Sequence, residues 1–311
     1  MTPPPNRQTD QIAAHHTLLV YEQDEEFVAL AEAYLSSVGA DGEIGYVIVP
    51  PAKRAQLEMA VGTADRVQFL HVDSVYSRPE ATIAYYDDLI RRHERRGDRV
   101  MRVIADLPAW KPGPERDAWI RYEALLNRVF LNRPVSLICG YDRRKQHSST
   151  LEAVWRTHPT VLDDDWQDNP SYEVPERVIE SVLPEPDPLP ELEELDVGVD
   201  DATLLENLRC GLRELRVRGA RAKRIQQAAV ELSENARRHG GAPRSQRLGR
   251  VGRHVVWELT DAGPGFADPC AGYIPPSGDQ ASERGLWTVR QLVDRLEFLS
   301  CSRGFTARIW L

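Results

Sequence analysis

An acidic, proline-rich segment near the middle of the chain constrains the fold most, because it cannot build a packed core of its own. Residues 161–206 hold sixteen Asp or Glu and six Pro, and Arg177 is their one basic residue. Their net charge of −15 leaves +6 for the rest of a chain whose total is −9. Low hydrophobicity, high charge and spaced prolines are typical of an extended connector. The 311 residues therefore predict two domains, at 13–165 and 196–311, joined by a linker at 166–195.

Short apolar runs alternate with helical patterns through the first half of the chain. We expect strands at 17–21, 44–50, 66–71, 100–106 and 135–141, and helices at 25–38, 52–61, 79–95 and 114–131. Strands separated by helices predict a parallel α/β sheet with right-handed crossovers. Ligands of such sheets bind beyond the carboxyl ends of the strands. This rule places His71, Asp106 and Tyr141-Asp142 near a pocket.

The sequence of the first half of the chain offers little support for nucleotide hydrolysis or for metal binding. It lacks a Gly-x-x-x-x-Gly-Lys-Ser/Thr loop, which disfavours a P-loop ATPase. A zinc set could be assembled from His15, His16, His158 and Cys139. Their spacing matches no standard zinc pattern, and adjacent side chains point apart on a strand. We therefore expect packed or hydrogen-bonded histidines here, and no nucleophile–base pair indicates an enzyme.

A helix predicted over 222–238 carries an apolar and a polar stripe. The apolar stripe recurs at spacings of four, three and four residues: Ile225, Ala229, Leu232 and Ala236. The polar stripe falls at i, i+4, i+7 and i+8: Glu231, Asn235, Arg238 and His239. A carboxylate and an amide one turn apart can hold a hydrated magnesium ion and orient a hydroxyl group.

Two further motifs follow this helix at regular intervals. Asp261-Ala262-Gly263-Pro264-Gly265 lies 26 residues after Asn235 and ends a strand predicted at 251–260, and Gly285-Leu286 lies 24 residues beyond Asp261. Around them we expect helices at 202–217 and 285–294 and a closing strand pair at 296–300 and 305–311. The Gly- and Pro-rich residues 267–284 suit a lid over a bound ligand.

These three motifs, in this order, resemble the N, G1 and G2 boxes of the GHKL family, whose Bergerat fold is an α/β sandwich that binds ATP and Mg²⁺. The compact form, with Gly-Leu-Trp-x-Val-Arg-Gln-Leu-Val-Asp after the lid, is similar to RsbW-type anti-sigma serine kinases. The resemblance implies that Asn235 holds Mg²⁺ and that Asp261 accepts a hydrogen bond from the adenine amine. It implies close backbone approach at Gly263 and Gly265, and phosphate-binding N–H groups at Gly285 and Leu286. Glu231 would be the catalytic general base.

The first half resembles the MEDS sensory domain, a KaiC-like α/β fold without a phosphate loop. The matching segments are His15-His16-Thr17-Leu18-Leu19-Val20-Tyr21, Arg121-Tyr122-Glu123-Ala124-Leu125-Leu126-Asn127, Leu137-Ile138-Cys139-Gly140-Tyr141-Asp142 and Thr157-His158-Pro159. The resemblance implies a small-molecule pocket, and we assign to it His16, Tyr21, Glu123, Tyr141 and Asp142. A MEDS domain fused to a compact GHKL domain resembles the RsbA-family anti-sigma regulators.

That resemblance implies a sigma factor or a STAS-type anti-anti-sigma protein as partner, serine-kinase potential, and a homodimer. A basic run at 213–224 could meet an acidic partner. Three departures favour an alternative, a nucleotide-insensitive sensory and interaction module with a degenerate ATPase fold. The second glycine box, Ser282-Glu283-Arg284-Gly285, has one glycine, and its Glu283 would face phosphate unfavourably. Gly304-Phe305 replaces the family's Gly-Thr, so that Thr306 would have to supply the adenine-side hydroxyl.

Composition narrows the setting in which the chain acts. No apolar run approaches the roughly 20 residues of a membrane span, and Met1–Pro5 do not read as a signal peptide. The four cysteines form no Cys-x-x-Cys pair, as expected of free thiols in a reducing compartment. We therefore expect a cytoplasmic protein that binds neither membrane nor nucleic acid directly, since no DNA-reading motif is present.

Overall fold

The computed structural model describes residues 15–36, 38, 43–61, 66–97, 100–182, 189, 191–198, 200–265, 268–276, 284–301 and 304–311. The chain divides into two compact units, Met1–Leu183 and Pro184–Leu311, and each is described by itself. The boundary between them falls inside the predicted linker.

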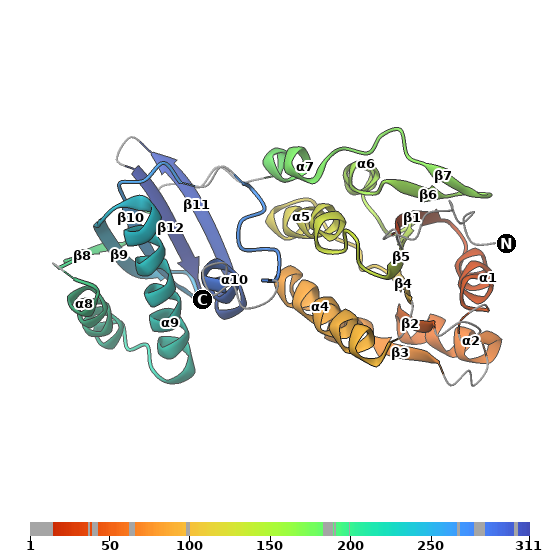
Figure 1. Ribbon diagram of the computed structural model, residues 1–311, viewed down its shortest axis with the longest axis horizontal. Coiled ribbons are helices and arrows are strands. Elements are labelled where there is room, and N and C mark those ends of the chain that lie inside the picture. Colours follow the sequence, from red (N-terminus) through yellow and green to blue (C-terminus); the bar gives the residue numbers. More distant parts are fainter. Residues whose placement is uncertain are drawn as a thin grey trace. The chain divides into compact units, whose positions relative to one another are not determined.

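The first unit is built on a seven-stranded, mostly parallel sheet with the order β3-β2-β4-β5-β1-β6-β7 (Figure 1). Its strands are β1 (His15–Tyr21), β2 (Ile44–Val49), β3 (Val67–His71), β4 (Met101–Asp106), β5 (Val135–Asp142), β6 (Thr160–Leu162) and β7 (Trp166–Asp168). The first five confirm the predicted parallel sheet, because strands covered on both faces are continuously apolar. β7 pairs with β6 in the antiparallel direction at one edge.

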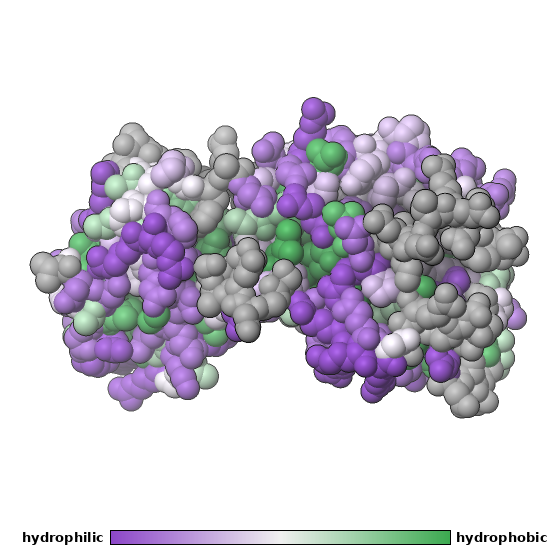
Figure 2. All heavy atoms as spheres, in the orientation of Figure 1, coloured by the Kyte–Doolittle hydropathy of each residue, from purple (hydrophilic) through white to green (hydrophobic). Residues whose placement is uncertain are grey.

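Helices cover both faces of this sheet. α1 (Asp24–Leu35) and α2 (Pro51–Val61) lie on one face, and α4 (Pro79–Arg96), α5 (Pro114–Val129) and α6 (Ser148–Thr157) on the other, while α3 (Val72–Val75) is a single turn after β3 (Figure 1). Local residue preferences set the ends of α4. Pro79 occupies its first turn, and Gly97 ends it with a left-handed φ of 76°. The outward face of α4 is strongly hydrophilic (Figure 2).

The segment predicted as a linker is shorter than expected. Residues 166–168 form β7, and Pro175–Ser181 form α7, which packs on α5. The acidic composition hides two apolar residues of α7, Val178 and Ile179, and both are fully buried. The free energy gained by burying these two side chains offsets the entropy cost of ordering a helix that is otherwise charged. Residues 166–181 of the predicted linker are therefore part of the first unit.

The second unit is an antiparallel five-stranded sheet with the order β11-β12-β10-β9-β8, covered by helices (Figure 1). Its strands are β8 (Glu193–Leu195), β9 (Pro243–Val251), β10 (His254–Asp261), β11 (Arg295–Cys301) and β12 (Gly304–Trp310). Its helices are α8 (Asp201–Glu214), α9 (Gly219–Asn235) and α10 (Arg284–Leu292), and the π-helical turn η1 (Ala236–Gly240) follows α9. One core cluster, which includes the fully buried Trp257, joins these helices to one face of the sheet.

The opposite face of this sheet carries alternating charges across four strands. In register, Arg308 of β12 lies opposite Glu297 of β11 and Glu258 of β10, and Glu258 lies opposite Arg247 of β9. Arg308 Nε donates to Glu258 Oε1 over 2.5 Å, and both side chains are almost fully buried. Opposite charges directly across a strand pair stabilise one register. The sequence prediction missed β9, because its polar face supplies part of this ladder and masks the apolar period.

Candidate functional site

The second unit contains a cavity, partly open to solvent, between the end of α9, the end of β10 and the start of α10. Its lining comes from all three predicted motifs and from the closing hairpin: Leu232, Asn235, Ala236, His239, Gly240, Leu259, Asp261, Gly265, Leu286, Phe298, Phe305 and Ala307. Motifs separated by 26 and 24 residues in sequence thus meet in one place.

The start of α10 lies directly against the polar stripe of α9. A Cβ added at Gly285 would lie 3.2 Å from Asn235 Nδ2 and 3.2 Å from Glu231 Oε2. Asn235 Nδ2 is buried and has no hydrogen-bond partner among the described residues. A buried, unpaired amide beside a helix start can serve a ligand that supplies the missing hydrogen bond.

Glu231 is half-buried on the same stripe. Burial, followed by the nearby negative charge of Glu234, raises the pKa of Glu231, and Arg238 partly opposes this shift. A carboxylate with a raised pKa accepts a proton more readily than an ordinary glutamate does. Glu231 borders Gly285 rather than lining the cavity itself.

Asp261 is held at the end of β10 by its own turn. Its Oδ1 accepts a hydrogen bond from the backbone N–H of Gly263 over 2.7 Å. Burial raises the pKa of Asp261, although this hydrogen bond works in the opposite direction. Gly240 allows η1 to approach, because a Cβ there would lie 2.3 Å from Asp261 Cγ. The carboxylate therefore faces the cavity from a fixed position.

The glycines of the second motif act differently from one another. Gly263 packs on Gly240, because a Cβ added at Gly263 would lie only 2.5 Å from the Gly240 Cα. Gly263 does not line the cavity. Gly265 lines it with a φ of 83°, and a Cβ there would strike the Phe305 ring at 2.3 Å. Sequence reasoning missed Phe298 and Phe305, whose ring centroids lie 5.3 Å apart in the cavity wall. Strand alternation, once β11 and β12 are paired, is the signal that identifies them.

The closing hairpin does not offer the predicted hydroxyl to the cavity. Thr306 Oγ1 lies 2.7 Å from Thr260 Oγ1 in a cross-strand hydrogen bond, and Thr306 is not part of the cavity lining. Of the predicted lid, residues 268–276 are described, and Ser282 and Glu283 lie outside the described residues. The guanidinium carbon of Arg290 lies 3.4 Å from the centroid of the Tyr273 ring, so α10 anchors the described part of this segment.

The basic run that begins near the end of α8 is only partly available to a partner. The Arg221 and Arg224 guanidinium groups donate to the backbone carbonyls of Leu311 and Leu292. Arg216, Arg218 and Lys223 are exposed. The surface left for an acidic partner is therefore smaller than the sequence suggests.

In the first unit, the pocket predicted for five residues is divided between the two faces of the sheet. His16, Glu123 and Tyr141 lie on the face covered by α5, whereas Tyr21 packs against Phe27 of α1 on the other face. Asp142 neighbours Tyr21 in register at the strand ends. The physical reason is strand alternation, since adjacent residues of β1 and β5 point to opposite faces.

The cluster on the α5 face is completely buried. His16 Nε2 lies 3.1 Å and His158 Nε2 3.4 Å from Glu123 Oε2. Burial, followed by His158, lowers the pKa of His16. The buried group thus resists a full positive charge on His16.

The cluster on the α1 face centres on Lys53, which the sequence prediction missed. Lys53 Nζ donates to Asp106 Oδ2 over 2.7 Å and also bonds the Tyr21 hydroxyl, which donates to Asp106 Oδ1 over 2.5 Å. Burial and the Asp106 hydrogen bond raise the pKa of Tyr21. Hydrogen bonds from Arg144 hold the pKa of Asp142 well below its usual range. The expected neighbour His71 is exposed and does not join these residues.

Comparisons with known proteins identify the first unit. Residues 15–159 match the MEDS family, described as the MEthanogen/methylotroph, DcmR Sensory domain, so this part of the chain is a MEDS sensory domain. The C-terminal region has no family assignment. No curated protein matches the chain. Among the described helices, none combines the length and the apolar character needed to cross a membrane.

Proposed function

We propose that this chain, whose residues 15–159 form a MEDS sensory domain, is a signalling protein in which a small-molecule sensor controls an ATP-binding regulatory unit. In this proposal the second unit is a Bergerat-type GHKL domain that acts as an anti-sigma factor with RsbW-like serine-kinase potential. The MEDS domain supports the sensory role. The anti-sigma role rests on the resemblance of the second unit and on the geometry of its cavity.

A single observation carries the nucleotide assignment. Asn235, Asp261 and Leu286 at the start of α10 line one cavity, although they are far apart in sequence. A loop aspartate or a helical asparagine alone is common, but their convergence with a helix N-terminus supplies three parts that a nucleotide needs. These are an acceptor for a base amine, an oxygen ligand for Mg²⁺ and N–H groups for phosphate.

In the proposed complex each part has a separate task. Asp261, fixed by Gly263, would select adenine over guanine, because a carboxylate only accepts hydrogen bonds. Asn235 would turn its amide oxygen to Mg²⁺, while Gly285 and Leu286 would donate N–H groups to the phosphates. Phe298 and Phe305 would contact the flat base.

Phosphoryl transfer, if the partner presents a serine hydroxyl, would use Glu231. The carboxylate takes the hydroxyl proton while the oxygen attacks the γ-phosphate and ADP leaves with the electron pair of the broken bond. Positioning and charge neutralisation dominate such reactions, so that one base and one Mg²⁺ can suffice. The raised pKa of Glu231 suits this task. A sigma factor or a STAS-type antagonist is the proposed partner, and Arg216, Arg218 and Lys223 offer it an exposed basic surface.

One observation favours a second candidate, a nucleotide-insensitive interaction module. Thr306 is engaged by Thr260, so the family's adenine-side hydroxyl is not offered to the cavity. In this alternative the fold persists and regulation occurs by partner binding alone.

Calorimetric titration of the full chain with ATP and Mg²⁺ separates the two candidates. We expect saturable ATP binding, weaker GTP binding, and a tenfold or greater loss of ATP affinity in Asp261→Asn. Thr260→Val, which changes a hydroxyl outside the cavity, is the matched control and should bind ATP normally. Absence of ATP binding at millimolar concentration, with partner capture unaffected by nucleotide, would establish the interaction module instead.

A second experiment tests the kinase step. With ³²P-labelled ATP and a co-purified partner, Glu231→Gln should abolish transfer while ATP affinity stays within about threefold. Equal labelling by the variant would remove Glu231 from the reaction.

A further inference from the structure

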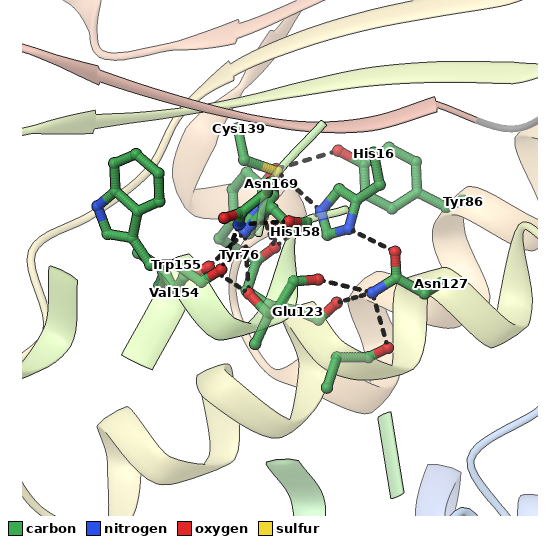
Figure 3. Close-up of polar contacts among 12 residues, drawn as sticks. His16, Tyr76, Tyr86, Glu123, Asn127, Cys139, Val154, Trp155, His158 and Asn169 are labelled. Atoms are coloured by element: carbon green, nitrogen blue, oxygen red, sulfur yellow. Dashed lines mark hydrogen bonds and ion pairs between the residues drawn. The ribbon is translucent and has the colours of Figure 1, made fainter. Parts of the chain in front are cut away.

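Four buried side chains in the MEDS domain direct potential ligand atoms at one point (Figure 3). They come from four elements that are distant in sequence: His16 on β1, Glu123 on α5, Cys139 on β5 and His158 at the end of α6. Their ligand atoms all lie within 4.8 Å of one another, and each residue is at most 3% exposed. The nucleotide proposal for the second unit uses none of them.

Four of the six spacings among these atoms match the edges of a metal-centred tetrahedron. Metal–nitrogen and metal–oxygen bonds of about 2.0–2.1 Å give edges of about 3.3 Å, and a metal–sulfur bond of about 2.3 Å gives edges of about 3.6 Å. Glu123 Oε2 lies 3.1 Å from His16 Nε2 and 3.4 Å from His158 Nε2. Cys139 Sγ lies 3.5 Å from His16 Nε2 and 3.6 Å from Glu123 Oε2. The longer distances are those that involve sulfur, as the tetrahedron requires.

The outer hydrogen bonds fix both imidazoles in the tautomer that a metal needs. His16 Nδ1 lies 3.1 Å from Asn127 Oδ1, and the Asn127 amide nitrogen donates to Thr157 O over 2.7 Å, so its oxygen faces the imidazole as an acceptor. His158 Nδ1 lies 2.7 Å from Val154 O, which can only accept. Both Nδ1 atoms therefore carry protons, and both Nε2 lone pairs point inward. Metal-bound histidines are oriented by this kind of second hydrogen bond.

This arrangement leaves the centre of the cluster rich in acceptors. Two Nε2 lone pairs and a carboxylate oxygen face one another, and the thiol proton of Cys139 can satisfy only one of them. His158 Nε2 has no hydrogen-bond partner among the described residues, although it is completely buried. Unpaired buried acceptors are costly. A divalent cation bound by a thiolate, a carboxylate and two neutral imidazoles would satisfy all four groups and leave no net charge in the interior.

We propose that His16, Glu123, Cys139 and His158 bind one divalent transition-metal ion of the zinc class. Imidazole and thiolate ligands favour such ions over Mg²⁺ or Ca²⁺, which prefer oxygen. All four positions are filled by protein, so the site is closed and structural rather than catalytic. The ion joins β1, α5, β5 and the α6–β6 turn. On binding, Cys139 releases its thiol proton to solvent as the metal–sulfur bond forms.

The metal alone is a sufficient probe of this proposal. The full chain, purified with zinc in the growth medium, should contain about one zinc per chain by mass spectrometry after gel filtration. The chain is then unfolded with a chelator and refolded with Co²⁺. It should show the visible bands of tetrahedral cobalt and a thiolate-to-cobalt charge-transfer band in the near ultraviolet.

Matched cysteine variants assign the ligand. Cys139→Ser should lose the charge-transfer band and at least tenfold in zinc affinity, whereas Cys210→Ser, which alters a thiol on α8 of the second unit, should retain both. The wild-type measurements stand even if Cys139→Ser fails to fold. A correctly folded wild-type chain without stoichiometric metal or a cobalt–thiolate band would overturn the proposal in favour of shared protons. A band that persists unchanged in Cys139→Ser would also overturn it.

Discussion

Replacement of Gly240 by alanine tests how the cavity of the second unit is built. The new Cβ would lie 2.3 Å from Cγ and from Oδ1 of Asp261, a short side chain that is tied to the Gly263 N–H. The carboxylate must move, and overpacking of this kind costs about 1–3 kcal/mol in the free energy of unfolding. If Asp261 binds adenine, its displacement removes a charge-assisted hydrogen bond worth about 1.5–3 kcal/mol. We therefore expect ATP affinity to fall about ten- to a hundredfold.

Gly252→Ala is the matched control for this substitution. Gly252 has a φ of 58° in the β9–β10 turn, and nothing lies within 4 Å of its added Cβ. The backbone strain of alanine at this φ should lower the free energy of unfolding of Gly252→Ala by about 1–2 kcal/mol, which is similar to the loss expected for Gly240→Ala. The turn lies about 24 Å along β10 from Asp261, at a rise of about 3.4 Å per residue.

Chemical denaturation and calorimetric ATP titration should be run on both variants. Both should lose stability, and only Gly240→Ala should lose ATP affinity. Normal ATP binding by Gly240→Ala, or equal weakening by Gly252→Ala, would refute the argument that Gly240 positions Asp261 for a ligand.

Three further changes probe other parts of the molecule. Lys53→Met should lower the free energy of unfolding by about 3–5 kcal/mol in denaturant titrations, because it removes the positive charge beside the buried Asp106 carboxylate. Asp106→Asn in the same chain should restore part of the loss, and a loss below about 1 kcal/mol in Lys53→Met would contradict the prediction. Without nucleotide, Asp261→Asn should melt at a higher temperature than the wild type near neutral pH. Burial raises the pKa of Asp261, so the folded wild type loses stability as the pH rises through the pKa and the carboxyl ionises, whereas asparagine cannot ionise. The difference in melting temperature should vanish in acid, and a pH-independent difference would contradict the prediction. Arg216→Gly should raise the free energy of unfolding by about 1 kcal/mol, because Arg216 ends α8 with a left-handed φ of 54° that glycine adopts without strain. An unchanged melting temperature would contradict this prediction.

Sequence patterns predicted the helices and strands well where one physical signal dominated. The first five strands are continuous apolar runs, and Pro79 and Gly97 mark the ends of α4. β9 was missed because its outward residues, such as Arg247, belong to a charge ladder that only the paired sheet reveals. α7 was missed because two buried residues are outweighed by acidic neighbours in the composition.

For the candidate sites too, the sequence selected some of the residues and missed others. The resemblance to the GHKL motifs selected Asn235, Asp261 and Leu286, and all three line one cavity. The predicted sensory pocket mixed His16 with Tyr21, because motif matching does not record which face of a strand a side chain occupies. Glu123 and His158 could not be joined from spacing, since α5 and the α6–β6 turn meet only through the crossovers of the sheet. Lys53 carried no motif, and its importance follows from its burial beside Asp106.

The most direct test of the central claim is a crystal structure of the full chain grown with a non-hydrolysable ATP analogue and Mg²⁺. We expect the adenine amine within hydrogen-bond distance of the Asp261 carboxylate, Mg²⁺ bound to the Asn235 side-chain oxygen, and phosphate oxygens facing the N–H groups of Gly285 and Leu286. An analogue bound elsewhere, or a cavity that stays empty at saturating analogue, would contradict it.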